Sequence, residues 1–112
     1  MDYHSVLFRE VEFLVWKSFL KELKRAKDPE LQEAIFKELI ANPSRGDQLK
    51  GGLRKARVGS KRQGTGKRGG YRYVFYVKTK TSIYLLALLD KSKADNFTKE
   101  FTDSLAEMVK FI

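Results

Sequence analysis

The sequence predicts an α+β domain with the element order β-α-α-β-β-β-α. Three observations lead to this prediction. Two stretches in the first half have the three-and-four spacing of amphipathic helices. Three stretches between residues 53 and 89 have the composition or the alternation of strands. A third amphipathic stretch ends the chain. The length of 112 residues fits a single domain, which we place at residues 1–112.

The first half of the chain predicts one short strand and two helices. Alternating apolar residues favour a strand over residues 5–9. Asp28-Pro29 opens the second helix, because Asp suits an N-cap and proline suits the first helical position. Asn42-Pro43 ends it, because the residue before proline avoids the α region. The apolar positions are Phe13, Trp16, Phe19, Leu20 and Leu23 in the first helix and Leu31, Ala34, Ile35, Leu39 and Ile40 in the second.

The second half predicts three strands and a helix. Residues 53–58 (LRKARV) form a strand with one cationic side, and residues 71–77 (YRYVFYV) form a strand by propensity. Residues 59–70 contain five glycines and no apolar side chain, which predicts a loop. Residues 82–89 (SIYLLALL) fit a central strand buried on both faces; periodicity also allows a helix, but the preceding hairpin favours the strand. The last helix begins near Thr98, with Phe97, Phe101, Leu105, Met108, Val109 and Ile112 on one face.

The positive charge is confined to one part of the chain. The 23 Lys and Arg residues and 14 Asp and Glu residues give a formal net charge of +9. No acidic residue lies between Gln48 and Leu89, and this segment holds 11 of the basic residues. The remainder has 12 basic and 14 acidic residues, so the segment accounts for the whole positive excess. Such a field attracts polyanions, although a solvated loop that only aids solubility is the alternative.

Several functional classes are excluded or disfavoured. The chain has no Cys and a single His, His4, so it contains neither a Cys-His pair nor a Ser-His-Asp triad. No acidic or His cluster has metal-ligand spacing, and we expect no metal or other cofactor. Residues 64–67 resemble a phosphate loop, but Lys61 and Arg68 stand where the Walker pattern needs Gly and Ser or Thr. We expect a cytoplasmic protein, because charges interrupt the N-terminus and no apolar run suits a membrane helix.

The remaining chemistry lies in a set of cations on strands and in the glycine-rich loop. Lys55 and Arg57 are two residues apart and therefore share one face of a strand. Arg72 follows the loop and can lie on the adjacent strand. Three cations on one strand face are costly unless they meet phosphates. Of Tyr71 and Tyr73, one is expected in the core and the other at a stacking edge. The set is Arg54, Lys55, Arg57, Lys61, Arg62, Lys67, Arg68 and Arg72.

The run GGLRKARV is followed by a Gly/Lys/Arg loop, by GKRGGYRYVFYV and by an apolar strand ending in LLDKSKADNF. With these motifs as the specific part, the whole chain resembles the HigB branch of the RelE toxins. The resemblance implies a RelE-like twisted antiparallel sheet with two N-terminal helices. It also implies a bacterial endoribonuclease that cleaves mRNA in the ribosomal A site without a metal. The implied partners are the ribosome, mRNA and a HigA-like helix-turn-helix antitoxin, through which alone operator DNA would be contacted.

The resemblance also assigns roles to residues. The RNA 2′-hydroxyl attacks the adjacent phosphate, which requires a proton acceptor and charge neutralisation. Lys55 and Arg57 match the two basic residues of the family's catalytic strand, and Arg72 matches the arginine at the start of the next strand. A lysine crowded by cations can approach a base, so Lys55 takes the base or transition-state role, and Arg57 and Arg72 clamp the phosphate. The expected RNA- and ribosome-binding residues are Arg54, Lys61, Arg62, Lys67, Arg68, Lys91 and Lys93.

The sequence departs from the family pattern near its end. Many relatives have an arginine after the residue that matches Lys91, and a C-terminal tyrosine that stacks on a base. Here Ser92 follows Lys91, and the last segment carries Phe97, Phe101 and Phe111 but no tyrosine. Core packing is the expected use of these phenylalanines, and base stacking is the alternative. The general acid is therefore not assigned.

Two functions of other classes compete with the nuclease. A non-catalytic nucleic-acid-binding module would also need cations facing phosphate. A structural ribosome-associated protein fits less well, because neither terminus is unusually basic.

Overall fold

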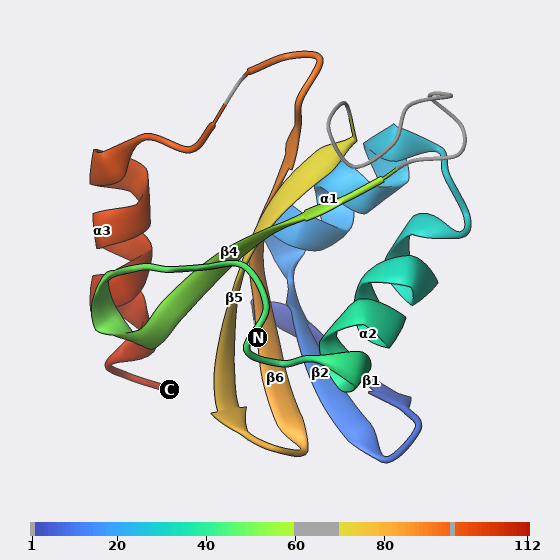
Figure 1. The fold of residues 1–112 in the computed structure, drawn as a ribbon, viewed down its shortest axis with the longest axis horizontal. Helices are drawn as coiled ribbons and strands as arrows, with labels where there is room; N and C mark the ends of the chain where they lie inside the picture. The colour runs from blue at the N-terminus through green and yellow to red at the C-terminus, as the bar shows by residue number, and fades with distance from the viewer. Residues whose placement is uncertain (1, 60–69, 95) are drawn as a thin grey trace.

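A six-stranded sheet forms the middle layer of the protein, with helices on both sides (Figure 1). The computed structural model describes residues 2–59, 70–94 and 96–112. The strand order is β1-β2-β6-β5-β4-β3. The elements are β1 Tyr3–Phe8, β2 Val11–Trp16, α1 Lys17–Ala26, α2 Leu31–Ala41, β3 Asp47–Gln48, the 3-10 turn η1 Lys50–Gly52, β4 Leu53–Val58, β5 Tyr71–Thr79, β6 Ser82–Asp90 and α3 Lys99–Val109.

The predicted α+β class is confirmed, and so is the central place of residues 82–89. β6 lies between β2 and β5, and its residues 83–88 are buried. It pairs antiparallel with β5 and parallel with β2, whereas the other neighbouring strands are antiparallel. Because both faces of β6 are covered, its sequence is nearly all apolar instead of alternating.

The predicted start of the first helix is wrong. Phe13 and Trp16 belong to β2, which forms a hairpin with β1, and α1 begins only at Lys17. The hairpin turn places Arg9 and Glu10 at φ values of 49° and 69°. Two positive φ angles are typical of the turns that carry Asn-Gly or Gly-Gly, so this Arg-Glu turn gives no composition signal. The order therefore begins β-β-α-α instead of β-α-α.

Two further boundaries differ from the sequence prediction. α2 begins at Leu31 instead of Pro29, because the Asp28 carboxylate accepts a hydrogen bond from the Glu30 N–H (3.1 Å) and forms a turn before the helix. A short strand, β3, pairs Asp47 and Gln48 with β4. At the last helix the prediction is confirmed: the Thr98 hydroxyl caps α3 by accepting a hydrogen bond from the Phe101 N–H (3.1 Å).

Two cores lie on opposite faces of the sheet. The larger core joins the sheet to α1 and α2, and it contains Phe13 stacked on Phe36 with ring centroids 4.0 Å apart. The smaller core joins the other face to α3 through residues such as Leu53, Val74 and Leu105. Within the described residues, no helix is both long and apolar enough to cross a membrane.

We predict that Phe13→Ala lowers the free energy of unfolding by about 3–5 kcal/mol, because it opens a cavity in the larger core. Leu7→Ala, on the edge strand β1 with 75% of Leu7 exposed, should change it by no more than about 0.5 kcal/mol. Urea unfolding of both variants measures the difference. Equal effects would contradict the placement of Phe13 in a strand facing the α1 and α2 layer.

Candidate active site

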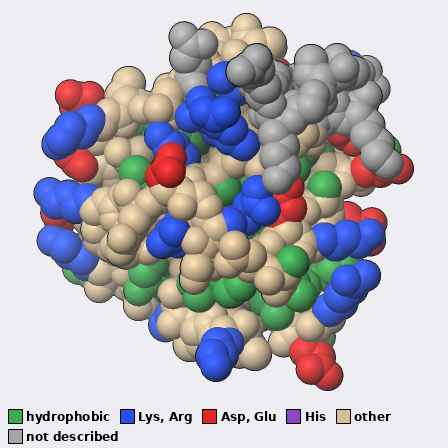
Figure 2. Space-filling view, viewed as in Figure 1, with side chains coloured by type: hydrophobic (Ala, Val, Ile, Leu, Met, Phe, Trp, Pro, Cys, Tyr) green, Lys and Arg blue, Asp and Glu red, His purple; other side chains and the backbone are tan. Residues whose placement is uncertain are grey.

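The structure brings Lys55, Arg57 and Arg72 together on one face of the sheet. On β4, Lys55 and Arg57 alternate in step with Leu53, which packs in the core under α3. On β5, Arg72 alternates with Val74, which packs in that same core. All three cations therefore face the α3 side of the sheet, close to the end of β4. In the space-filling view, a group of Lys and Arg side chains gathers in the upper half of the molecule (Figure 2).

Arg57 and Arg72 are directly opposite each other in the β4–β5 pairing. Like charges at such positions repel each other. The Nε atom of Arg72 is buried and lacks a hydrogen-bond partner among the described residues, whereas Arg57 is exposed. Within the same residues, no ion pair joins either guanidinium to a carboxylate. The pair is thus a local concentration of positive charge that no carboxylate of the described residues neutralises.

Lys55 is held by a residue from a distant part of the chain. Its Nζ donates a hydrogen bond to the side-chain oxygen of Asn96 (3.1 Å), which lies 41 residues later. Lys55 is half-buried, and Val74 is its partner across the β4–β5 ladder. The ammonium therefore has a defined position on the same face as the arginine pair.

Lys91 and Lys93 lie in the turn after β6, at the same end of the sheet. The Lys91 N–H donates to the Gly70 carbonyl (3.1 Å), which joins this turn to the start of β5. The Lys93 N–H donates to the Asp90 carbonyl (3.0 Å). Leu89 of β6 pairs with Arg72 of β5. The turn therefore begins only two residues after the position on β6 that lies beside Arg72.

Of the other predicted binding residues, only Arg54 lies within the described part of the chain, and it is not on this face. Arg54 points to the opposite face, where its Nε and Nη2 donate to the carbonyls of Arg45 (2.9 Å) and Gly46 (3.0 Å). Lys61, Arg62, Lys67 and Arg68 lie outside the described residues.

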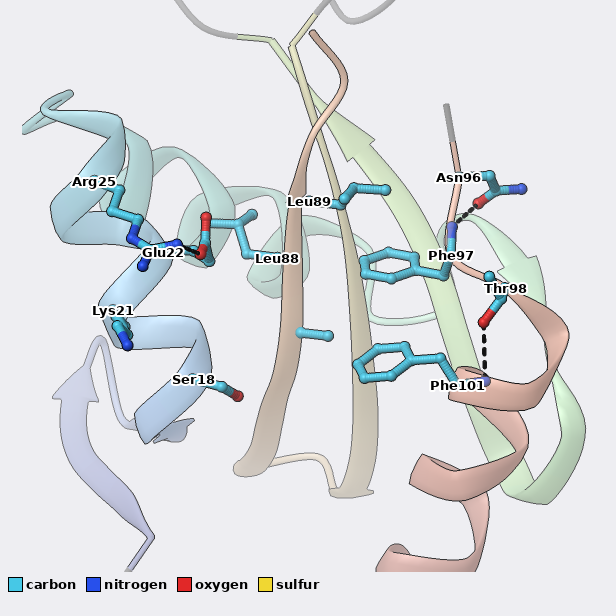
Figure 3. A pocket seen from close by; sticks show the side chains of 11 residues that line it. Ser18, Lys21, Glu22, Arg25, Leu88, Leu89, Asn96, Phe97, Thr98 and Phe101 are labelled. Atoms are coloured by element: carbon cyan, nitrogen blue, oxygen red, sulfur yellow. Dashed lines mark hydrogen bonds and ion pairs between the residues drawn. The ribbon is translucent and has the colours of Figure 1, made fainter. Parts of the chain in front are cut away.

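A pocket of about 500 Å³ adjoins the cationic face, between α1 and α3 and over the end of β6 (Figure 3). Asn96 lines it and so connects it to Lys55. The rings of Phe97 and Phe101 stack with centroids 5.7 Å apart and point toward β6. The opposite wall is formed by residues of α1: Ser18, Lys21, Glu22 and Arg25.

A protein-family model described as the RelE toxin of the RelE/RelB toxin–antitoxin system matches residues 13–112. The chain belongs to the RelE toxin family. It is therefore the toxin of a toxin–antitoxin pair, and its partner is an antitoxin.

Two expectations about aromatic residues of this RelE toxin need correction. Tyr71 and Tyr73 are both buried in the larger core, because residues two apart share a face, so neither provides a stacking edge. The expected core packing of Phe97, Phe101 and Phe111 is confirmed only in part. Phe97 is half-buried, but Phe101 is 43% exposed and Phe111 is 91% exposed.

Sequence analysis missed Asn96, Arg45 and Glu38. Asn96 gave no signal, because nothing in the sequence pairs it with Lys55. Glu38 accepts a hydrogen bond from the Tyr73 hydroxyl (3.0 Å). Burial of the Tyr73 hydroxyl and, second, the nearby Glu38 charge raise the pKa of Tyr73 well above its usual value.

Across the described part of the RelE toxin, no group of three or more His, Asp or Glu residues could hold a metal ion.

We predict that Arg57→Gln raises the free energy of unfolding by about 0.2–1 kcal/mol at low ionic strength, because it removes the repulsion across the β4–β5 ladder. Arg25→Gln serves as the control, because Arg25 already pairs with Glu22 (2.9 Å) and its loss should be neutral or slightly destabilising. Chemical denaturation gives both values. A loss above about 1 kcal/mol in Arg57→Gln would show that Arg57 stabilises the free toxin.

Proposed function

We propose that the protein is a ribosome-dependent endoribonuclease of the HigB branch that cleaves mRNA in the ribosomal A site. The observation that carries this proposal is the Arg57–Arg72 pair, which faces one side of the sheet without a carboxylate partner among the described residues. Two guanidinium groups at directly opposed positions on neighbouring strands can donate hydrogen bonds to the non-bridging oxygens of one phosphate. The RelE family membership supports the same conclusion.

The proposed reaction is an intramolecular displacement at phosphorus. The 2′-oxygen forms a bond to the neighbouring phosphorus while its proton passes to Lys55 or to water. The bond from phosphorus to the 5′-oxygen breaks, and the leaving 5′-oxygen takes a proton from water, which leaves a 2′,3′-cyclic phosphate and a 5′-hydroxyl. Negative charge grows on the phosphate oxygens in the transition state, where Arg57 and Arg72 stabilise it. Their fixed positions on two paired strands avoid reorganisation during the reaction.

Lys55 acts on the same phosphate from the neighbouring position of β4. It either accepts the 2′-hydroxyl proton or, as an ammonium, donates a hydrogen bond to the transition state. Its hydrogen bond to Asn96 restricts the side chain to the cationic face. In this proposal the ribosome orders the mRNA strand over the cationic face, and cleavage therefore depends on the ribosome.

We further propose that the antitoxin partner is a HigA-like helix-turn-helix protein with an acidic or amphipathic segment. The cationic face supports this chemistry, because a covering segment must neutralise Lys55, Arg57 and Arg72. Contact with operator DNA would then pass only through the antitoxin.

We predict that Lys55→Ala, Arg57→Ala and Arg72→Ala each abolish growth arrest and reduce cleavage of translated mRNA by about 10²–10³-fold. Arg62→Ala and Lys67→Ala in the glycine-rich segment, and Lys91→Ala and Lys93→Ala, should cause only partial losses, because single phosphate contacts add up. Induction of each variant in cells, with mapping of mRNA ends, measures both effects.

Lys80→Ala is the control, since Lys80 is exposed in the β5–β6 turn at the opposite end of the sheet. Circular dichroism confirms that each variant folds. Near wild-type cleavage by folded Arg57→Ala and Arg72→Ala would refute the site. Tight ribosome binding by the wild type without any mRNA cleavage would instead support a non-catalytic nucleic-acid-binding module.

A further inference from the structure

A chain of polar contacts braces β4 from the face opposite the cationic site. Arg54 holds the carbonyls of Arg45 and Gly46, as described above. The Nη2 atom of Arg45 then donates to the carbonyl of Arg57 (3.3 Å) and forms an ion pair with Glu38 (3.4 Å). Glu38 also accepts the hydrogen bond from the Tyr73 hydroxyl. We name these four residues, Arg54, Arg45, Glu38 and Tyr73, the β4 brace.

The brace acts where the sheet itself gives β4 the least support. β3 covers the outer edge of β4 only at Arg54 and Lys55, so no described strand lies beside Arg57 on that edge. There the carbonyl of Arg57 accepts its hydrogen bond from the Arg45 side chain. At Arg57, a hydrogen bond from a side chain thus takes the place of the backbone hydrogen bond that a neighbouring strand would provide.

The turn at Gly46 fits closely against the backbone of Lys55. Gly46 has a φ of +80°, and a Cβ atom built there would lie 2.1 Å from the Lys55 carbonyl oxygen. Only glycine combines this dihedral with this approach. The turn that carries Arg45 is therefore in direct contact with β4 at both Lys55 and Arg57.

The brace also reaches the strand of the second arginine. Tyr73 is fully buried and lies next to Arg72 in β5, opposite Ala56 in the register. Arg45 and Glu38 keep only about a fifth of their side chains exposed (20% and 19%). Charged hydrogen bonds that are shielded from water hold their geometry better than exposed ones. The backbones at Arg57 and at Arg72 are thus both connected to Glu38 on α2.

We propose that Arg54, Arg45, Glu38 and Tyr73 are positioning residues that fix the separation of Arg57 and Arg72 against their mutual repulsion, and that Arg54 is not an RNA ligand. This inference rests on the proposed nuclease function. Two of the three guanidinium nitrogens of Arg54, Nε and Nη2, already donate to backbone carbonyls, and its side chain points away from the cationic face. A bidentate phosphate contact through this edge of the guanidinium would have to displace those carbonyls.

Arg54→Lys separates positioning from RNA binding. Lysine keeps the charge that a phosphate contact needs, but it cannot hold two carbonyls with a planar fork. We expect single-turnover cleavage on ribosomes to fall about 10- to 100-fold, as for a small displacement of a catalytic group. Ribosome affinity and its salt dependence should stay unchanged. Glu38→Gln retains an acceptor for Tyr73 but loses the charge facing Arg45. It should likewise lower cleavage without changing ribosome affinity.

Lys80→Ala is again the control, and thermal unfolding identifies any variant that has lost its fold. Wild-type cleavage by Arg54→Lys, together with a salt slope lowered by roughly 1 in Arg54→Ala, would assign Arg54 to RNA and overturn the inference.

A second measurement is independent of activity. The Nε–Hε NMR signals of Arg57 and Arg72 should shift in Arg54→Lys and Glu38→Gln but not in Lys80→Ala. If the wild type cleaves no mRNA, the proposed function fails. The NMR signals of Arg57 and Arg72 then test by themselves whether the β4 brace positions these two side chains. Unchanged signals in both brace variants would refute it.

Discussion

The repulsion between Arg57 and Arg72 is the constraint on which the rest of the site depends. Opposed positions on antiparallel strands place two permanent positive charges side by side on one face of the sheet, and the Nε atom of Arg72 is buried there without a partner among the described residues. A protein keeps such an arrangement only if the surrounding structure holds it. Under the proposed function, this repulsion would be relieved when an anionic phosphate binds, which is the behaviour expected of a pre-organised phosphate clamp.

The two faces of the sheet contribute differently to stability and to the site. The face toward α1 and α2 contains the larger core, and its apolar packing supplies the stability that the cationic site lacks. The face toward α3 carries a smaller core at one end and the cations at the other. Asn96, from the segment before α3, reaches back to Lys55, so the position of α3 also influences the site. The toxin can thus carry cations that have no carboxylate partner in the described part of the chain, because a separate layer stabilises the strands.

Much of the fold was predictable from local patterns, because these depend on a few neighbouring residues. The propensity of residues 71–77 and the apolar run of residues 82–89 gave β5 and β6, and alternation placed Lys55 and Arg57 on one face. The β1–β2 hairpin was not predictable, because its turn at Arg9 and Glu10 lacks the usual glycine. Nor was the pairing of Arg57 with Arg72, because register between separate strands is decided by tertiary packing. The same limit applies to Arg54, because its carbonyl partners are visible only in the folded chain.

The central claim is that Arg57 and Arg72 act on one phosphate as a single clamp. A double-mutant cycle with Arg57→Ala, Arg72→Ala and the double variant, measured as single-turnover cleavage on programmed ribosomes, tests it most directly. If the two arginines form one clamp, the double variant should lose little more activity than either single variant, because groups that act as a unit are strongly non-additive. Multiplied losses in the double variant would show that the two arginines act at separate places and would contradict the claim.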